Sequence, residues 1–327
     1  MMKKTVDLNP YLFNDVEFKA SRDGFGEGIV DAGLNNKDIV LLCCDLTEST
    51  RSLDFKKKFP DRFIEIGVAE QNMAGIAAGL AFSGKIPFIT SYGVFSPGRN
   101  WDQIRVSICY SQANVKIIGA HAGISVGPDG ATHQALEDIA IMRVLPNITV
   151  VVPCDYFEAK KATIESAKSK GPFYIRIARD KTPIVTKQET PFKIGRAEIF
   201  RDGKDISIIA NGPLVYQSLL AAKDLEKENI SVQVINCHTI KPLDKETIIQ
   251  AVRSTNAVVT AEDHQINCGL GSAISELLSE NYPVPIKRIG VKDHFGESGN
   301  PDELMQKFHL VKEDIIKSVK DVLKLKK

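Results

Sequence analysis

In Phe63-Ile-Glu-Ile-Gly-Val-Ala-Glu-Gln-Asn-Met-Ala-Gly-Ile-Ala-Ala-Gly-Leu80, a short apolar run passes directly into a helical pattern. The run predicts a strand over Phe63–Ile66, and the pattern after it predicts a helix over Glu70–Phe82. That helix consists almost wholly of Ala, Gly, Ile and Met, so we expect other parts of the protein to pack closely on several of its sides. We interpret Phe63–Phe95 as one wall of a pocket whose other wall is absent from this chain.

Apolar runs and helical patterns alternate on both sides of this segment. The predicted strands are 39–44, 63–66, 87–92, 115–120, 148–152 and 173–177, and the predicted helices are 23–34, 70–82, 101–111, 135–145 and 156–170. Near-continuous apolar strands between helices are typical of a parallel sheet that is covered on both faces. The sequence therefore predicts an α/β fold.

The chain turns polar between Asp180 and Arg201, where it contains Pro183 and Pro191 and shows no helical period. We place a domain boundary there, which divides the chain into residues 1–188 and 189–327. Alternation then resumes, with strands near 206–210, 231–236, 256–261 and 285–290 and helices near 214–228, 245–253, 271–280 and 311–325. The second part is therefore predicted to be a smaller α/β domain.

The composition excludes several classes of protein. A length of 327 residues allows two domains, and the formal net charge of +1 gives no reason to expect nucleic acid or an anionic membrane as a partner. No apolar run reaches the ~18 residues that a membrane span needs. Met1-Met2-Lys3-Lys4 is not followed by an apolar segment, so we predict no signal peptide. The six cysteines form no CxxC pair, which indicates free thiols in a reducing cytoplasm and no zinc site.

Two tempting motifs carry little weight on their own. Gly24, Gly26 and Gly28 imitate a nucleotide-binding loop, but no apolar strand precedes them. His121 and His133 imitate metal ligands, yet Asp129 and the glycines around them favour a polar loop. Glu70, at the start of its helix, is explained without any ligand by the helix dipole, which stabilises such a carboxylate by ~0.3–1 kcal/mol.

Several motifs taken together resemble one family. Asp45-Leu-Thr-Glu-Ser-Thr, Gly67-Val-Ala-Glu-Gln-Asn-Met, Asp102-Gln-Ile-Arg, the segment His121-Ala-Gly-Ile-Ser-Val-Gly-Pro-Asp-Gly-Ala-Thr-His-Gln134 and Ala135-Leu-Glu-Asp resemble the pyrimidine-binding domain of transketolases. Thr260-Ala-Glu-Asp-His and Phe295-Gly-Glu-Ser-Gly resemble the C-terminal domain of that family. The resemblance covers nearly the whole chain. It implies a thiamine-diphosphate-binding, pyrimidine-type parallel-sheet domain followed by a smaller α/β transketolase C-terminal domain.

The resemblance gives Glu70 a chemical role. In this family the matching glutamate hydrogen-bonds the N1′ atom of the thiamine aminopyrimidine, which favours the imino form that removes a proton from the thiazolium. Tyr92 and Phe95 match aromatic residues around the pyrimidine, and Asp45 matches a carboxylate close to the cofactor. The chain has one more residue between Phe95 and Asp102 than common family members, so the roles of Pro97, Gly98 and Arg99 stay open.

The resemblance also implies a sugar-phosphate site. The positions that match phosphate-binding residues of the family are Arg22, Ser49, His121 and Arg179. Arg176 is a nearby competitor for the last role, but register with the family favours Arg179. Asp129 and His133 match residues that bind hydroxyls of the donor sugar, and His133 is the second expected catalytic residue after Glu70. The other interpretations are a surface arginine for Arg22 and an Asx-turn for Asp129.

Only two of the three transketolase domains are present. The missing N-terminal domain holds the diphosphate and the Mg²⁺ in this family, so we expect no metal ligands here and a separate N-terminal subunit. Because the family region begins within about twenty residues of Met1, we interpret the chain as a complete C-terminal subunit that is inactive alone and forms an α₂β₂ assembly. The expected reaction transfers a two-carbon ketol unit from a ketose phosphate to an aldose phosphate.

Three alternatives remain. They are a 1-deoxyxylulose-5-phosphate synthase, which normally has arginine at the position of His121, a 2-oxoacid dehydrogenase beta subunit, and a half that only binds and regulates its partner.

Overall fold

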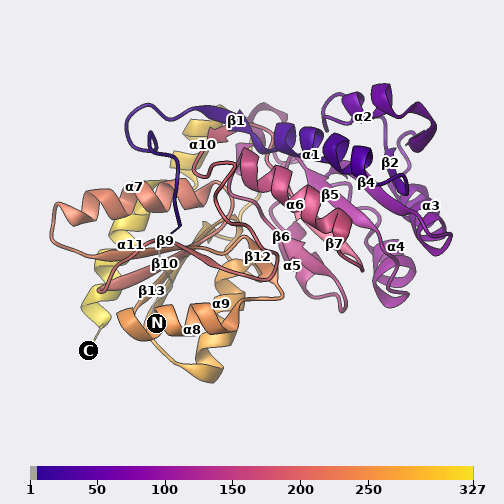
Figure 1. The fold of residues 1–327 in the computed structure, drawn as a ribbon. Coiled ribbons are helices and arrows are strands. Elements are labelled where there is room, and N and C mark those ends of the chain that lie inside the picture. The colour runs from indigo at the N-terminus through magenta and orange to yellow at the C-terminus, as the bar shows by residue number, and fades with distance from the viewer. Residues whose placement is uncertain (1–5, 327) are drawn as a thin grey trace.

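A seven-stranded sheet lies at the centre of the first domain in the computed structural model, which describes residues 6–326 (Figure 1). Its order is β12-β6-β7-β5-β4-β2-β3. All neighbours are parallel except the edge strand β12. The strands are β2 (Ile39–Cys43), β3 (Phe63–Glu65), β4 (Ile86–Tyr92), β5 (Lys116–Ala120), β6 (Thr149–Val151), β7 (Phe173–Arg176) and β12 (Thr239–Lys241). The prediction of a parallel sheet is therefore confirmed, while the predicted lack of a signal peptide at Met1–Lys4 concerns residues outside the described range.

Helices cover both faces of this sheet. The helices are α1 (Ser21–Asn35), α2 (Leu53–Lys58), α3 (Glu70–Phe82), α4 (Trp101–Gln103), α5 (Asp138–Arg143) and α6 (Tyr156–Lys168). On β2, Ile39 and Leu41 face a core shared with α1 and α6, and Val40 and Leu42 face a core shared with α3 and α5. The helix predicted over 101–111 is instead α4 followed by a π-helix, Ile104–Tyr110.

The glycines of α1 serve helix packing. A Cβ atom on Gly24 would lie 2.1 Å from the carbonyl oxygen of Tyr156, and one on Gly28 would lie 2.9 Å from that of Lys160. Both carbonyls belong to α6, which runs beside α1 (Figure 1). Only glycine allows the two helix backbones to approach so closely.

The second domain has a five-stranded sheet in the order β14-β13-β10-β11-β9, in which only β9 is antiparallel. The strands are β9 (Glu198–Arg201), β10 (Ile206–Ala210), β11 (Val232–Asn236), β13 (Val258–Gln265) and β14 (Ile286–Val291). The helices are α7 (Leu214–Glu226), α8 (Lys245–Thr255), α9 (Leu270–Asn281), α10 (Pro301–Lys307) and α11 (Lys312–Leu325). The chain is thus an α/β protein with a parallel-sheet domain and a second α/β domain, as predicted.

Some short elements were not predicted. β1 (Phe18–Ala20) and β8 (Lys181–Pro183) form a small antiparallel pair. β12 lies in the second half of the chain and nevertheless adds to the sheet of the first domain, against β6. A run of three residues is too short to carry a periodic signal, so these strands could not be recognised from the amino-acid pattern. The boundary between 188 and 189 stays a prediction. Within residues 6–326, no helix has the length and apolar character to cross a membrane.

Candidate functional site

A cluster of rings lies where the parallel strands β4 and β5 end. Tyr92 is the last residue of β4, and His121 directly follows β5. Their ring centroids are 4.0 Å apart and nearly stacked. Phe95 lies 5.9 Å from Tyr92 and 5.5 Å from His133, which meets it edge-on. Because ligands of parallel α/β sheets bind beyond the carboxyl ends of the strands, these four rings mark the candidate site.

Glu70 begins α3 and is 1% exposed. Its Oε1 accepts a hydrogen bond from Ser91 Oγ at 3.2 Å, and its Oε2 accepts one from Arg99 Nη1 at 2.9 Å. The guanidinium of Arg99 also lies over the Phe95 ring, 4.7 Å from its centroid. Arg99 therefore joins the buried carboxylate to the aromatic cluster. The sequence left the role of Arg99 open, because its position depends on the shape of the loop after Phe95.

His121 is buried among positive charges. Burial, with Arg22 and Arg179 nearby, lowers the pKa of His121 to about 3, so its imidazole is neutral at neutral pH. Arg22 Nη1 lies 3.3 Å from His121 Nε2. Since a guanidinium can only donate, Nε2 must accept and the proton resides on Nδ1. That Nδ1 atom is buried and has no hydrogen-bond partner among the described residues.

Two arginines flank this histidine. Arg22 Nη1 also donates to the backbone oxygen of Ser49 at 3.1 Å, and burial lowers the pKa of Arg22. Arg179 Nη1 donates to the Val126 carbonyl at 2.7 Å and lies 4.0 Å from Asp129 Oδ1. Two guanidiniums in a partly buried site attract an anion, because neither has a fully engaged carboxylate partner there.

Arg176, the sequence competitor of Arg179, points into the interior. It is 4% exposed, and its Nε donates to Asp138 Oδ2 at 2.8 Å. Burial distinguishes the two arginines, and the register of the family resemblance had favoured Arg179 for the phosphate-binding role.

Of the remaining predicted residues, His133 belongs to the ring cluster, whereas Asp45 contacts Glu65. His133 Nδ1 is 2.9 Å from Thr132 Oγ1. Asp45, two residues after β2, donates from its backbone N–H to Glu65 Oε1 at 2.7 Å, and Glu65 Oε1 also accepts from the backbone N–H of Gly67. The sequence did not single out Glu65, which ties the loop after β2 to the turn before α3. Within residues 6–326, no group of His, Cys, Asp or Glu side chains is arranged to hold a metal ion.

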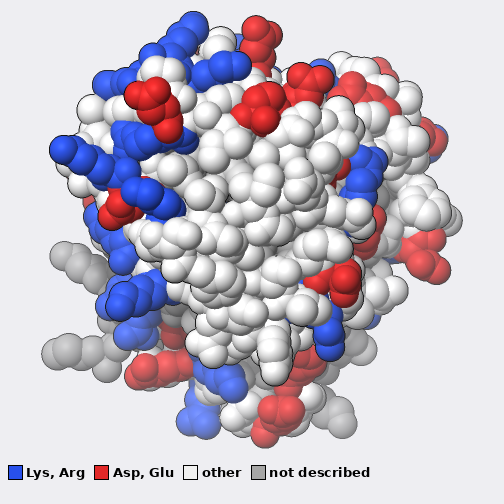
Figure 2. Space-filling model, turned by 90° about the vertical axis from the view of Figure 1, so that its right-hand side faces the viewer, with Lys and Arg blue, Asp and Glu red and all other residues white. Residues whose placement is uncertain are grey.

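No element within residues 6–326 covers the outer face of α3. A Cβ atom on Gly75 or Gly79 would meet no described atom within 4 Å other than its chain neighbours and the backbone of its own helix. Nearby apolar side chains are strongly exposed, with Val68 72%, Phe82 63% and Tyr110 82% exposed. Figure 2, which views this side of the molecule, shows a broad area without charged residues. We call the area around these five residues the α3 face.

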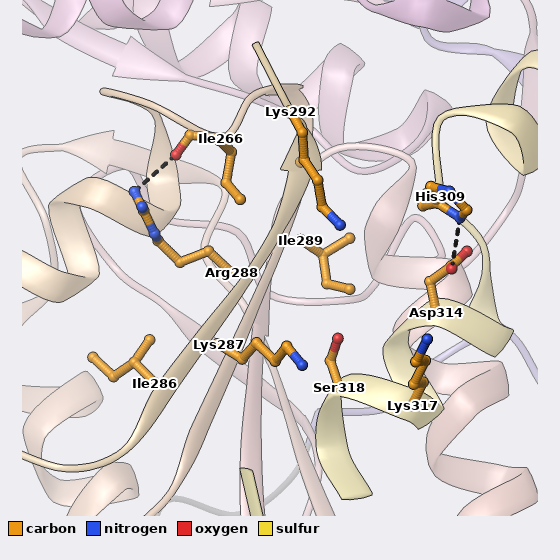
Figure 3. A pocket seen from close by; sticks show the side chains of 11 residues that line it. Ile266, Ile286, Lys287, Arg288, Ile289, Lys292, His309, Asp314, Lys317 and Ser318 are labelled. Atoms are coloured by element: carbon orange, nitrogen blue, oxygen red, sulfur yellow. Dashed lines mark hydrogen bonds and ion pairs between the residues drawn. The ribbon is translucent and has the colours of Figure 1, made fainter. Parts of the chain in front are cut away.

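A hollow on the second domain lies apart from this site, between β14 and α11 (Figure 3). Several of its charged groups are already paired: Arg288 with the Ile266 carbonyl, Lys287 with Asp321 and His309 with Asp314. It shares no residue with the candidate site.

Comparison with known proteins identifies both halves of the chain. Residues 19–184 match the family model "Transketolase, pyrimidine binding domain", and residues 195–315 match "Transketolase, C-terminal domain". The chain is 44% identical to a "Putative transketolase C-terminal section" of Methanocaldococcus jannaschii, over 94% of this chain and 97% of that protein. It is 39% identical to a 6-deoxy-6-sulfo-D-fructose transketolase subunit of Clostridium sp. strain MSTE9, over 93% and 95% of the two chains.

A solved structure agrees with these relatives. A protein described as "Split gene transketolase, inactive beta4 tetramer" superimposes with a TM-score of 0.89 at 45% identity, over 94% of this chain and 99% of that chain. By contrast, the chain spans about half the length of the rat and mouse transketolases that it matches. The chain therefore belongs to the transketolase family and consists of its pyrimidine-binding and C-terminal domains.

Proposed function

We propose that this chain is the C-terminal subunit of a split, thiamine-diphosphate-dependent transketolase. It would transfer a two-carbon ketol unit from a ketose phosphate to an aldose phosphate, and only together with a separate N-terminal subunit. The observation that carries the proposal is a buried carboxylate, Glu70, which Arg99 joins to the Phe95 ring, in a site where Phe95 and His121 both lie against Tyr92 and Arg22 lies beside His121.

The residues present fit the pyrimidine end of thiamine diphosphate. Phe95 and Tyr92 offer aromatic surface to a flat heterocycle, which gains ~0.5–1.5 kcal/mol from an offset aromatic partner beyond the burial of area. Glu70 would hold a proton at the ring nitrogen N1′, where a carboxyl group serves both as donor and as acceptor. When bound, the cofactor would supply the electron sink for cleavage of the carbon–carbon bond beside the donor ketone.

The sugar would lie toward the arginines. Arg22 and Arg179 would neutralise its anionic end, while Asp129 and His133 would orient its hydroxyl groups. A phosphate monoester carries about −1.5 to −2 charges at neutral pH, so two guanidiniums match it well. A sulfonate carries one charge, and the likeness to a sulfo-sugar transketolase subunit makes a sulfonated donor the second candidate.

The partner would bind at the α3 face. Monomeric proteins rarely expose large contiguous apolar areas, and such areas usually mark interfaces. Glu70 is the first residue of α3, so a subunit bound along that helix would lie close to the candidate site. That subunit would carry the diphosphate grip and the Mg²⁺ ligands. We expect an α₂β₂ assembly in the cytoplasm that works in the pentose phosphate pathway, where the free cysteines would stay reduced.

The test is a reconstitution. The chain is mixed with its N-terminal subunit, thiamine diphosphate and Mg²⁺, and release of glyceraldehyde 3-phosphate from xylulose 5-phosphate plus ribose 5-phosphate is followed. Each subunit alone is the control and should be inactive. Product formation that requires pyruvate would instead support the synthase or dehydrogenase alternatives and would refute the proposal.

A further inference from the structure

The loop of residues 121–134 carries three of the predicted substrate groups, namely His121, Asp129 and His133. It leaves the end of β5 and reaches α5, and its middle is a pair of 3-10 turns over Ile124–Asp129. Gly123, Gly127 and Gly130 all have positive φ angles, at 93°, 77° and 74°. Such a glycine-rich path has little rigidity of its own, so contacts from outside must hold its shape.

The first contact is the carboxylate of Asp263 on β13 of the second domain. It is 1% exposed, and its Oδ1 accepts a hydrogen bond from the Ile124 N–H at 2.9 Å, across 139 residues of sequence. The other oxygen, Oδ2, lies against Gly123, where a Cβ atom would come within 2.0 Å of it. Burying a carboxylate away from water costs free energy. Its use here therefore indicates that the position of the loop backbone matters.

The same strand also holds the end of the loop. Arg176 Nη2 donates to the carbonyl oxygens of Asp263 at 2.7 Å and Ala135 at 3.1 Å. The Gln265 N–H donates to the Leu136 carbonyl at 2.8 Å. The motif Thr260-Ala-Glu-Asp-His and the residue after it therefore contact both ends of the loop.

The segment 295–301 of the second domain covers the middle of the loop. Gln134 Nε2 donates to the Glu297 carbonyl at 3.0 Å and to the Ile124 carbonyl at 3.1 Å. A Cβ atom on Gly296 would lie 1.7 Å from Gln134 Oε1, and one on Gly130 would lie 2.4 Å from Ser298 Oγ. The lack of a side chain at Gly296 and at Gly130 therefore lets the motif Phe295-Gly-Glu-Ser-Gly pack closely against the loop.

We infer that the second domain holds the loop of residues 121–134 in place, and that Asp263 is the main positioning residue. Both family motifs of that domain then have a physical role, because they fix the loop that presents His121, Asp129 and His133. This inference concerns the loop itself, and only its kinetic part rests on the proposed function.

The first experiment is hydrogen exchange on the full chain, with and without its partner subunit. In Asp263→Ala, the amides of residues 122–134 should exchange at least about tenfold faster than in the wild type, because the acceptor of the Ile124 N–H is gone. Asp263→Asn keeps an acceptor oxygen and the side-chain shape, so it should restore most of the protection. Unchanged exchange of the loop in a folded Asp263→Ala chain would overturn the inference.

The matched control is Asp244→Ala. Asp244 is a buried carboxylate of the same domain, and it accepts hydrogen bonds from the Ala197 and Thr247 N–H groups, far from the loop in sequence. This variant should lower the melting temperature and leave the exchange of residues 122–134 as in the wild type. Faster exchange of the loop in this control as well would mean that general destabilisation is the cause, and the inference would fail.

A second variant tests the same inference in case Asp263→Ala does not fold. Gly296→Ala places a methyl group against Gln134 without any backbone strain, because Gly296 is not among the residues with positive φ. It should speed hydrogen exchange of residues 122–134 although the substitution is in the other domain. Amide protection equal to that of the wild type would contradict the inference.

Kinetics separate positioning from stability. In the reconstituted enzyme, Asp263→Ala should raise KM for the donor at least about fivefold and change half-saturation by thiamine diphosphate less than about twofold, because the loop presents substrate groups and not cofactor groups. An equal loss of cofactor affinity would contradict a role confined to the loop. An inactive wild-type assembly would refute the proposed function and leave the exchange result standing, so the two failures are distinguishable.

Discussion

Arg99 donates a hydrogen bond from Nη1 to Oε2 of Glu70 at 2.9 Å, so the carboxylate at the start of α3 already has a cationic partner. The side chain of Glu70 is buried, whereas that of Arg99 is 48% exposed and rests on Phe95. A pyrimidine that binds Glu70 beside Phe95 has to share or take the place of this guanidinium. Arg99 is thus a competitor for the same two partners that the cofactor would use.

Arg99→Met should therefore strengthen cofactor binding. The methionine keeps an apolar stem on the Phe95 ring and frees Oε2 of Glu70, so half-saturation by thiamine diphosphate in the reconstituted enzyme should fall severalfold. Titration of activity against cofactor measures this. Lys292→Met, at an exposed position of the second domain, is the control and should have no effect. Weaker binding in Arg99→Met would show that the guanidinium supports the cofactor instead.

Glu70→Gln should remove turnover while preserving the fold. Glutamine has nearly the same shape, but its amide cannot exchange a proton with N1′, and loss of an acid–base group usually costs ~10²–10⁴-fold in rate. Single-turnover kinetics at saturating cofactor provide the measurement, and circular dichroism checks the fold. Activity close to that of the wild type would argue that Glu70 is only a helix-end carboxylate.

His121 should make stability fall in acid. Its pKa is about 3 in the folded chain and 6.5 as the ordinary value, so between these pH values the unfolded chain binds a proton that the folded chain does not. From pH 7 to pH 5 this linkage lowers the free energy of unfolding by about 2 kcal/mol. His121→Gln should lose that part of the pH dependence in denaturant titrations, while the control His294→Gln, at an exposed position, should keep it. Identical pH profiles for wild type and His121→Gln would contradict the burial of a neutral imidazole.

Gly79→Glu should block subunit association. It places a charge on the α3 face, where the new Cβ would meet no described atom within 4 Å beyond its chain neighbours and the backbone of its own helix, so the chain itself should fold normally. In the assembly the carboxylate would be desolvated without a partner, which is strongly unfavourable. Light scattering after mixing with the N-terminal subunit should show separate subunits. Gln250→Glu adds the same charge to an exposed site on α8 and should assemble like the wild type. Normal assembly of Gly79→Glu would place the interface elsewhere.

The sequence predicted what depends on local pattern. β2 and β5 are buried at every position, which is why continuous apolar runs revealed the parallel sheet. Tyr92 ends β4, His121 follows β5 and Glu70 begins the helix after β3, so their placement at one edge followed from the fold and from the resemblance to a family. Their roles in binding stay predictions.

Long-range and irregular features could not be predicted in this way. The bond from Ile124 to Asp263 spans 139 residues, and no periodicity reports it. Arg176 and Arg179 are three residues apart in similar surroundings of sequence, and only the fold buries one beside Asp138. The π-helix at Ile104–Tyr110 has the apolar spacing of an ordinary helix, so the sequence pattern did not distinguish it from an α-helix.

The strand β12 has a consequence for any attempt to separate the two domains. It comes from the second half of the chain, yet it covers the outer side of β6 in the first sheet. A polypeptide ending at residue 188 would lose this strand and leave β6 as an open edge with unpaired N–H and C=O groups. Open edges recruit strands from other molecules, so the severed domain would tend to aggregate. The two domains are consecutive along the chain, yet a strand from the second half completes the sheet of the first.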